Sequence, residues 1–403
     1  MPLSLALPTI DGRIERYTLS EAEPWRAPAK PSFNRIAFSA AHVVADARAA
    51  NDPWLDCAID WDRTLAYRRH LWSMGLGVAE AMDTAQRGMG LDWPTSLELI
   101  RRSLDAARDV PGALVASGCG TDHLAADAAS SVDDVIGAYE EQMAAIEGLG
   151  GRLILMASRA LARVARSPAD YERVYDRLLR QARQPVILHW LGDMFDPALK
   201  GYWGSSDVDA AMETALAVIH ANPAKVDGIK ISLLDKDKEI AMRRRLPARG
   251  GPDGTGVRMY TGDDFNYAEL IAGDGAGSSS NQGRSDALLG IFDAIAPAAS
   301  AALAELASGN EARFHQILAP TVPLSRHIFR APTRFYKTGV VFMAWINGHQ
   351  DHFVMVGGQQ STRSMPHFAE LFKLADAAGL IEQPGLAAAR MKTLLALHGV
   401  DHA

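Results

Sequence analysis

Cysteine is scarce in this chain of 403 residues, which contains only Cys57 and Cys119. Two cysteines argue against a disulfide scaffold and against a zinc site built on thiolates, and they fit a reducing compartment. No apolar run reaches the ~18 residues of a membrane-spanning helix. The first residues also lack the basic start and apolar stretch of a secretion signal. We therefore expect a cytoplasmic protein with no membrane partner.

An excess of positive charge is also missing. The 41 Lys and Arg residues are outnumbered by 48 Asp and Glu residues, which gives a formal net charge of -7. A chain of this kind has no overall basic field to attract nucleic acid, so we expect no nucleic-acid partner. With 48% hydrophobic and 22% charged residues, the chain can bury the core of one large domain or of two modest ones.

The common nucleotide and metal motifs are absent as well. No G-x-G-x-x-G opens the first predicted helix, and no G-x-x-x-x-G-K-[ST] or H-E-x-x-H occurs. The segment GCGTD at 118–122 follows a predicted strand but is too short to indicate phosphate binding. We therefore predict no cofactor and no metal ligands.

Short apolar segments alternate with longer segments of helical periodicity. The predicted strands are residues 36–40, 78–83, 113–118, 152–158, 185–190, 228–232 and 257–262, with a weak eighth at 277–281. The predicted helices include residues 61–74, 94–108, 132–149, 168–183, 208–221 and 288–307. Eight such units predict an α/β fold, a (β/α)8 TIM barrel. A doubly wound open sheet is the alternative, which the missing glycine fingerprint disfavours.

The barrel is expected to span residues 35–310, after an N-terminal extension of residues 1–34. Residues 311–403 have a mostly helical pattern and predict a C-terminal helical extension, which could cap the barrel or form a subunit contact. An aromatic cluster in this region looks exposed in the sequence, and its packing against the barrel is the favoured interpretation. The cluster consists of Phe335, Tyr336, Phe342 and Trp345.

Lys230 is a lone lysine inside a β-branched apolar run, in the segment DGIKIS at 227–232. Because side chains alternate along a strand, Lys230 points opposite to Ile229 and Ile231, toward the interior of a closed barrel. A buried amine loses its proton more easily, and a neutral lysine amine is the nucleophile that forms a Schiff base with a carbonyl compound. A lysine at a strand end that pairs with a carboxylate or reaches solvent is the simpler alternative.

In a TIM barrel the active site lies at the carboxyl ends of the strands, so the candidate site residues are expected at those positions. The polar and ionisable residues found there are His42, Asp83, Thr84, Cys119, Asp122, Ser158, Arg159, His189, Trp190, Lys230, Ser232, Thr261, Asp263 and Asn281. Part of this set is expected at any barrel mouth, since a mouth is polar whatever the function.

Two positions can be given roles from the sequence. His189 ends the strand next to that of Lys230, and with an ordinary pKa near 6.5 it could relay a proton. A core histidine bonded to a carbonyl is an equally good interpretation. After the second strand, the hydroxyl of Thr84 and nearby N–H groups could hold a carboxylate, although Asp83 or Thr84 could instead cap the loop.

Four segments together resemble the dihydrodipicolinate synthase and N-acetylneuraminate lyase family of class I aldolases. They are DGIKIS, PVILHW before it, YTGDD at 260–264 after it, and GALVASGCG at 112–120. The resemblance covers roughly residues 35–310. It implies a (β/α)8 barrel with extra C-terminal helices, a homo-oligomer, and a Schiff base between Lys230 on the sixth strand and a 2-keto acid.

The departures from this family are informative. Met82-Asp83-Thr84-Ala85-Gln86 stands where the family has Gly-Thr-Thr-Gly-Glu, so only Thr84 matches. His189 stands where the family has a proton-relay tyrosine, and Met194 where the synthases have an arginine for a second carboxylate. Lysine biosynthesis is therefore not expected, and the loop 192–206 is enlarged. Charge could still come from Arg159, Lys200 or Arg284.

The sequence and this resemblance thus predict a lyase or aldolase that forms a Schiff base with a 2-keto acid or keto-sugar derivative and then catalyses aldol cleavage, condensation or dehydration. The predicted catalytic residues are Lys230 and His189, and the predicted substrate contacts are Asp83, Thr84, Ser232, Gly262 and Asp263. Two alternatives stay open. One is a divalent-metal enzyme that uses some of His42, Asp83, His189, Asp235 and Asp263, and the other is a barrel that binds a keto compound without turning it over.

Overall fold

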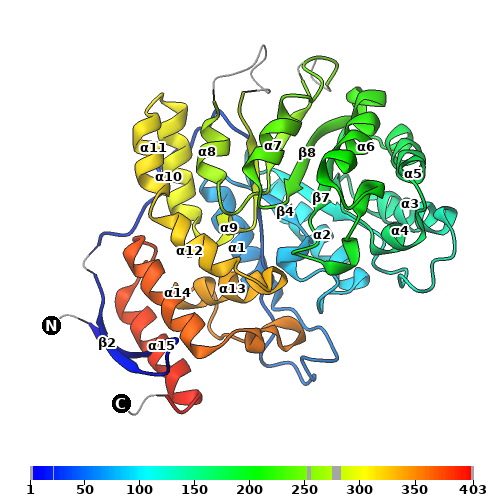
Figure 1. Ribbon diagram of the computed structural model, residues 1–403. Coiled ribbons are helices and arrows are strands. Elements are labelled where there is room, and N and C mark those ends of the chain that lie inside the picture. The colour runs from blue at the N-terminus through cyan, green and yellow to red at the C-terminus, as the bar shows by residue number, and fades with distance from the viewer. Residues whose placement is uncertain (1–2, 21, 252–255, 275–282, 401–403) are drawn as a thin grey trace.

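Eight parallel strands form a closed barrel, as the sequence predicted (Figure 1). The computed structural model describes residues 3–20, 22–251, 256–274 and 283–400. Around the barrel the strands are β3 (Ala37–Ala40), β4 (Gly77–Glu80), β5 (Val115–Cys119), β6 (Arg152–Leu155), β7 (Val186–Leu191), β8 (Val226–Ser232), β9 (Arg258–Thr261) and β10 (Asp286–Leu289). β10 pairs with both β9 and β3, and this pairing closes the barrel.

Helices connect the strands and cover the outside of the barrel. They are α1 (Trp61–Ser73), α2 (Trp93–Arg108), α3 (Val132–Gly148), α4 (Arg159–Val164), α5 (Pro168–Gln181), α6 (Val208–Ala221), α7 (Lys236–Arg243) and α8 (Tyr267–Ala272). Their starts follow local sequence signals. Ser131 and Asp134 form a capping box at α3, and Asp92 caps α2 just before its early proline.

The eighth strand differs from its predicted place. The weak candidate at 277–281 lies outside the described residues, whereas the strand that closes the barrel is β10. The predicted helix at 288–307 was also wrong at its start, because residues 288–289 belong to that strand. The chain then forms α9 (Ile291–Ala294) and α10 (Ala296–Ala307). Leu288 and Leu289 are apolar enough for either structure, and pairing with β3 decides between them.

The barrel interior is filled by inward-facing side chains. Phe38, Ile154, Ile187, Tyr260 and Leu288 belong to one buried cluster with small residues of other strands. By contrast, the isoleucines on either side of Lys230 pack with the surrounding helices in a separate cluster. This alternation places Lys230 inside the barrel.

The C-terminal region is helical, with the elements α11 (Glu311–Leu318), α12 (Thr321–Ile328), α13 (Tyr336–Ile346), α14 (Met365–Ala377) and α15 (Pro384–Leu397). In Figure 1, α10 and α11 lie beside the barrel, while α14 and α15 form a separate group at the lower left. An antiparallel hairpin of β1 (Ser4–Pro8) and β2 (Ile14–Thr18) packs on that group, so the two ends of the chain lie together.

Asp376 fastens the N-terminal segment to α14. The hydroxyl of Tyr17 and the N–H of Ser20 donate to its carboxylate at 2.6 and 2.7 Å. The sequence did not predict this hairpin in the N-terminal extension. Its two strands pair only with each other, and the residues that they pack against lie more than 350 positions away.

The aromatic cluster of the C-terminal region is largely buried rather than exposed. Tyr336, Phe342 and Trp345 are at most 6% exposed. α13, which carries all three, packs against α9, α12 and α14. Within the described part of the chain, no helix combines the length and the apolar character needed to cross a membrane.

Candidate active site at the carboxyl ends of the barrel strands

Lys230 lies in the middle of β8, the sixth strand of the barrel, and is 5% exposed. In the strand register it stands beside His189 of β7 and Tyr260 of β9. Burial lowers the pKa of its amine, while the carboxylates of Asp83 and Asp264 oppose part of this effect. The amine is therefore easier to deprotonate than that of an exposed lysine.

His189 is buried next to Lys230, and neither ring nitrogen has a hydrogen-bond partner among the described residues. Burial and the charge of Lys230 lower the pKa of His189 to about 3, against a smaller opposing effect of Asp83. The pKa of His189 therefore lies below the unperturbed histidine value of 6.5. His189 is a neutral imidazole near pH 7, with two nitrogens free for a ligand.

Asp83 and Thr84 do not lie on the second strand itself. β4 ends at Glu80, and both residues belong to the short 3-10 helix η1 (Asp83–Ala85). Burial alone would raise the pKa of Asp83, but Lys230, Lys337 and His189 lower it to about 2. Asp83 is therefore ionised near neutral pH and places a carboxylate near the lysine amine.

Tyr336 reaches this helix from α13. Its hydroxyl lies 2.7 Å from the hydroxyl of Thr84 and donates to Asp83 at 3.1 Å. Burial and the charge of Asp83 raise the pKa of Tyr336 well above its ordinary value. The structure therefore supplies a tyrosine hydroxyl at the barrel mouth, although from the C-terminal region and not from the fifth strand.

The two aspartates that follow β9 have different surroundings. The carboxylate of Asp263 accepts bonds from the N–H groups of Phe265 and Asn266 and from the Asn266 amide, so it stabilises a turn. The carboxyl group of Asp264 accepts a bond from Ile291 N at 2.9 Å and interacts electrostatically with Lys230.

Burial raises the pKa of Asp264 to about 7, even though that hydrogen bond and Lys230 oppose the increase. A carboxyl group with this pKa can give or take a proton near neutral pH. Asp263 is the aspartate predicted from the sequence to contact the substrate, whereas in the structure Asp264 is the one that interacts with Lys230. Residues 260, 262 and 264 lie two positions apart, so their side chains share one face of an extended chain. This alternation would have pointed to Asp264.

Gly262 and Ser232 lie close to the lysine side chain. A Cβ atom at Gly262 would be 2.8 Å from Lys230 Cε, 2.4 Å from Ser232 Oγ and 2.5 Å from the carbonyl oxygen of Ile231. No L side chain fits at such distances, so a glycine here makes room for the lysine.

A cavity of about 260 Å³ reaches Asp83 and His189, two neighbours of Lys230, although Lys230, Gly262 and Ser232 are not part of its lining. Asp83, His189 and Lys337 line it, together with two arginines that are already paired. Arg87 donates to Asp122 at 2.9 Å, and Arg159 donates to Asp196 at 2.5 Å. Asp122 and Asp196, the partners of these arginines, also line the cavity, and the remaining residues are Gly88, Met89, Gly120, Thr121, Leu124, Ala125, Ala126, Met156, Ala157, Ser158, Ala160, Leu191, Phe195 and Leu199.

Lys337 is the cation of the cavity that has no carboxylate bonded to it within the described chain. It is 3% exposed, and its ammonium group donates to the Arg334 carbonyl at 3.1 Å and lies over the Tyr336 ring. Burial lowers its pKa to about 8, while Asp83 opposes this effect. At neutral pH it supplies a positive charge inside the cavity.

Several other residues singled out in the sequence lie away from this cavity. Trp190 packs against Trp203 on the outside of the barrel, and Thr261 donates to Glu239 there. Cys119 is buried near the carbonyl of Tyr139. Asn281 lies outside the described residues.

The residues of the metal-enzyme alternative do not form one cluster. His42 lies 2.9 Å from Asp293, with both side chains fully buried, and Asp235 caps α7. Asp263 stabilises its turn, as described above. No group of three possible metal ligands is found among these residues in the described chain, so the structure does not favour this alternative.

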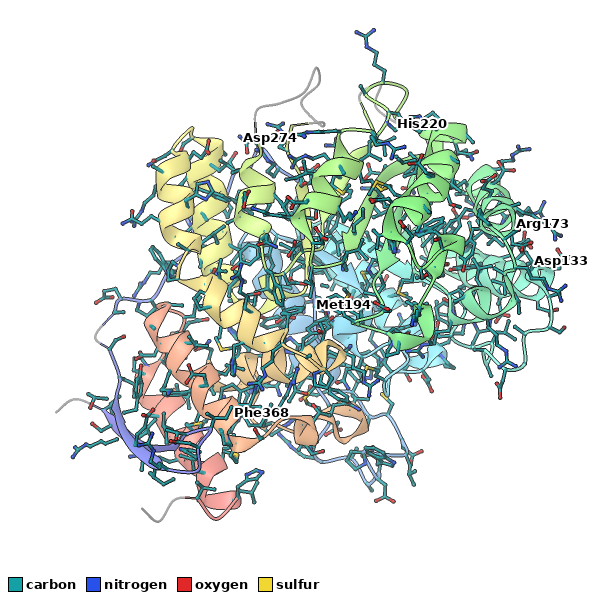
Figure 2. The ribbon with its side chains drawn as sticks, in the orientation of Figure 1. Asp133, Arg173, Met194, His220, Asp274 and Phe368 are labelled. Atoms are coloured by element: carbon teal, nitrogen blue, oxygen red, sulfur yellow. The ribbon has the colours of Figure 1, made fainter. Side chains whose placement is uncertain are left out.

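Met194, labelled in Figure 2, lies on the loop after β7 and is 36% exposed. It is not among the residues that line the cavity. Of the three cations considered as substitutes for an arginine there, only Arg159 lies at the cavity. Arg284 lines a different pocket with Arg35, and Lys200 lies in a third pocket. The sequence pointed to Tyr336 only as part of the aromatic cluster and gave no signal for Lys337, since both residues lie about 250 positions from η1.

The fold is shared with solved dihydrodipicolinate synthases, which confirms the predicted resemblance at the level of structure. The synthase of Thermotoga maritima has a TM-score of 0.59 at 15% identity, over 87% of this chain and 100% of that chain. The pyruvate complex of the chloride-inhibited synthase of Acinetobacter baumannii has a TM-score of 0.59 at 16% identity, over 86% and 100%.

The 4-hydroxy-tetrahydrodipicolinate synthase of Methylacidiphilum fumariolicum SolV has a TM-score of 0.60 at 14% identity, over 89% of this chain and 99% of that chain. At these identities the likeness establishes the fold, which class I aldolases and lyases use. A comparison with curated protein sequences gives no match. One family model, described as a protein of unknown function (DUF993), matches residues 5–400, and the chain therefore belongs to the DUF993 family.

Proposed function

We propose that this protein is a lyase or aldolase that forms a Schiff base between Lys230 and a 2-keto acid or a keto-sugar derivative. The observation that carries the proposal is the position of Lys230, buried inside the barrel on the sixth strand, near two carboxyl groups and next to His189, which lines a cavity of about 260 Å³. Burial favours the neutral amine, which is the nucleophilic form.

The amine of Lys230 attacks the ketone carbon, and loss of water gives a protonated imine. The imine then withdraws electrons from the adjacent carbon, so a proton or a carbon substituent can leave that carbon. Asp264, with its pKa raised to about 7, is suited to accept and return this proton. The hydroxyls of Tyr336 and Thr84 form a second route for protons, and it ends at Asp83.

The part of the cavity near Lys337 favours an anionic group of the substrate. Lys337 supplies a positive charge, and His189 offers two unbonded ring nitrogens. A carboxylate or a sugar hydroxyl would bond to these groups. Position 194 is a methionine and not an arginine, which fits a reaction partner without a second carboxylate. Pyruvate, the ligand of the Acinetobacter baumannii synthase structure, is the first keto acid to test.

Borohydride trapping tests the proposal directly. The protein is incubated with pyruvate, and separately with longer 2-keto acids, reduced with borohydride, and analysed by intact mass and by peptide mapping. We expect one reduced adduct per chain, on Lys230. Lys230→Ala should abolish the adduct, whereas Lys236→Ala, which removes an exposed lysine paired with Glu269, should retain it. Absence of an adduct on Lys230 with every keto acid would overturn the proposal.

The same experiment addresses the alternative of a barrel that binds without turnover. Pyruvate binding to Lys230→Ala is measured by calorimetry. If the variant binds as tightly as the native protein, and the native protein gives no adduct, the barrel is a binding protein. If the native protein is trapped, the Schiff-base proposal stands.

A further inference from the structure

Two histidines and a glutamate form a compact group on the side of α1 that faces the C-terminal region. One nitrogen of His70, one nitrogen of His349 and one oxygen of Glu382 all lie within 4.8 Å of one another. The two imidazole rings are 4.4 Å apart, and His349 Nε2 lies 3.3 Å from Glu382 Oε1. No other group of three such ligands is found in the described parts of the chain.

The three residues come from three separate segments. His70 is in the last turn of α1, His349 follows α13, and Glu382 follows α14. A bond shared by all three would join the barrel to the C-terminal helical region. It would also fix the far end of α13, the helix whose first two residues are Tyr336 and Lys337.

The group contains an unsatisfied polar atom. His70 Nε2 is buried and has no hydrogen-bond partner among the described residues. A buried imidazole nitrogen without a partner costs free energy, because water no longer solvates it. A bound cation would provide the missing partner.

The space between the side chains has the size of a single ion or water molecule. His70, His349 and Glu382 line a small cavity of about 10 Å³, together with Tyr67, Asp293 and Asn347. The centre of one water-sized sphere fits in such a volume, and an organic ligand does not. Two of the lining groups are carboxyls, and their negative charge would attract a cation.

Neighbouring hydrogen bonds hold two of the three ligands in place. The side-chain oxygen of Asn347 accepts a bond from Glu382 N at 2.9 Å, and its amide donates to the Leu380 carbonyl at 2.9 Å. The N–H of His349 donates to the Ala344 carbonyl at 3.0 Å at the end of α13. Bonds of this kind orient ligands before a metal binds.

We propose that His70, His349 and Glu382 bind a divalent transition-metal ion of the zinc class, which fastens the C-terminal helical region to the barrel. Two imidazole nitrogens and one carboxylate oxygen suit zinc and its neighbours, whereas calcium and magnesium prefer ligand sets made of oxygen. Water completes the coordination. This site is separate from the proposed Schiff-base chemistry and does not depend on it.

Metal binding by the full chain tests this inference. The protein is treated with a chelator, exchanged into metal-free buffer, and titrated with Zn²⁺ by calorimetry and with Co²⁺ by visible absorption. We expect one ion per chain, a rise in melting temperature with Zn²⁺, and the visible bands of Co²⁺ bound to nitrogen. A chain that binds neither ion at one equivalent would overturn the inference.

Variants assign the ligands. His349→Ala and Glu382→Gln should each weaken Zn²⁺ binding by about tenfold or more, a scale that even supporting residues of metal sites reach. His315→Ala is the matched control, since His315 pairs with Glu311 on the exposed side of α11 and should leave binding unchanged. His70→Gln, in a helix with a preserved cap, serves as a third variant if either of the others does not fold. Native-like affinity in any folded ligand variant would contradict the assignment.

Discussion

The hydroxyl groups of Thr84 and Tyr336 lie 2.7 Å apart, although 252 positions separate them in the sequence. Thr84 is part of the barrel, and Tyr336 begins α13 of the C-terminal region. Phe195, from the loop after β7, packs edge-on against Tyr336 and supports its ring. The C-terminal region therefore contributes directly to the proposed active site.

Removal of the Tyr336 hydroxyl should impair proton transfer without unfolding the protein. We expect Tyr336→Phe to slow the exchange of pyruvate methyl protons with deuterated water, measured by NMR, by about 100-fold or more. Tyr267→Phe is the control, because it also loses a buried hydroxyl bond, at 2.6 Å to Thr321. Equal exchange rates in the two variants would argue against a proton route through Tyr336.

Asp264 should control the pH dependence near neutrality. Its raised pKa of about 7 means that the carboxylate needed to accept a proton forms as pH rises through 7. The exchange rate of the native protein should therefore rise between about pH 6 and 8. In Asp264→Asn the rate should fall and lose this rise. A variant that keeps the same rise would assign it to another group.

The carboxyl group of Asp264 also makes the stability of the fold depend on pH, and stability should fall with rising pH where the exchange rate rises. The pKa of Asp264 is raised in the folded state, so its contribution to stability is present below its ordinary value of 3.8 and is lost as pH increases through about 7. Urea unfolding of Asp264→Asn at pH 5 and pH 8 should show the variant gaining stability relative to the native protein at the higher pH.

Lys337 should contribute to the binding of anionic substrates. Lys337→Met is expected to raise the pyruvate concentration that half-saturates borohydride trapping by about tenfold, since a charged hydrogen bond contributes roughly 1.5–3 kcal/mol. Because the pKa of Lys337 is lowered to about 8, the native protein should lose affinity above that pH, as the ammonium charge disappears.

A matched lysine provides the control for this prediction. Lys225 also donates to a backbone carbonyl, that of Ala182 at 2.7 Å, but it lies near the start of β8. Lys225→Met should leave the saturation of trapping unchanged. An equal effect of both substitutions would indicate a general loss of stability and not a role in the cavity.

Gly262→Ala should disturb the lysine and the barrel together. The added methyl group would lie 2.5 Å from the Ile231 carbonyl, which the sheet holds in place. We expect a loss of about 1–3 kcal/mol in the free energy of unfolding. Trapping on Lys230 should also slow. Urea unfolding and trapping kinetics measure the two effects.

Gly137→Ala is the opposite case and serves as the control for this substitution. Gly137 is exposed within α3, and an added Cβ meets no atom within 4 Å. Alanine there should raise the free energy of unfolding by about 0.5–1 kcal/mol, because glycine loses more conformational freedom in a helix. Stability gained at position 262 would contradict the crowding around Lys230.

The sequence by itself determined the barrel and the direction of Lys230. Alternation of side chains in DGIKIS and the strand-helix period are local properties, and they place an amine inside a closed sheet wherever the rest of the chain packs. The last strand was misplaced because Leu288 and Leu289 carry no periodic signal, and only pairing with β3 makes them a strand.

Tertiary structure alone decided which groups surround the lysine. Lys337 reaches the cavity and Tyr336 reaches Thr84 and Asp83 because α13 packs against α9, and no spacing in the sequence encodes that contact. Burial then sets the protonation of the site, with His189 held neutral and Asp264 near its midpoint at pH 7. The sequence specifies the chemical group of each side chain. The pKa of that group depends on the charges and the solvent that folding places around it.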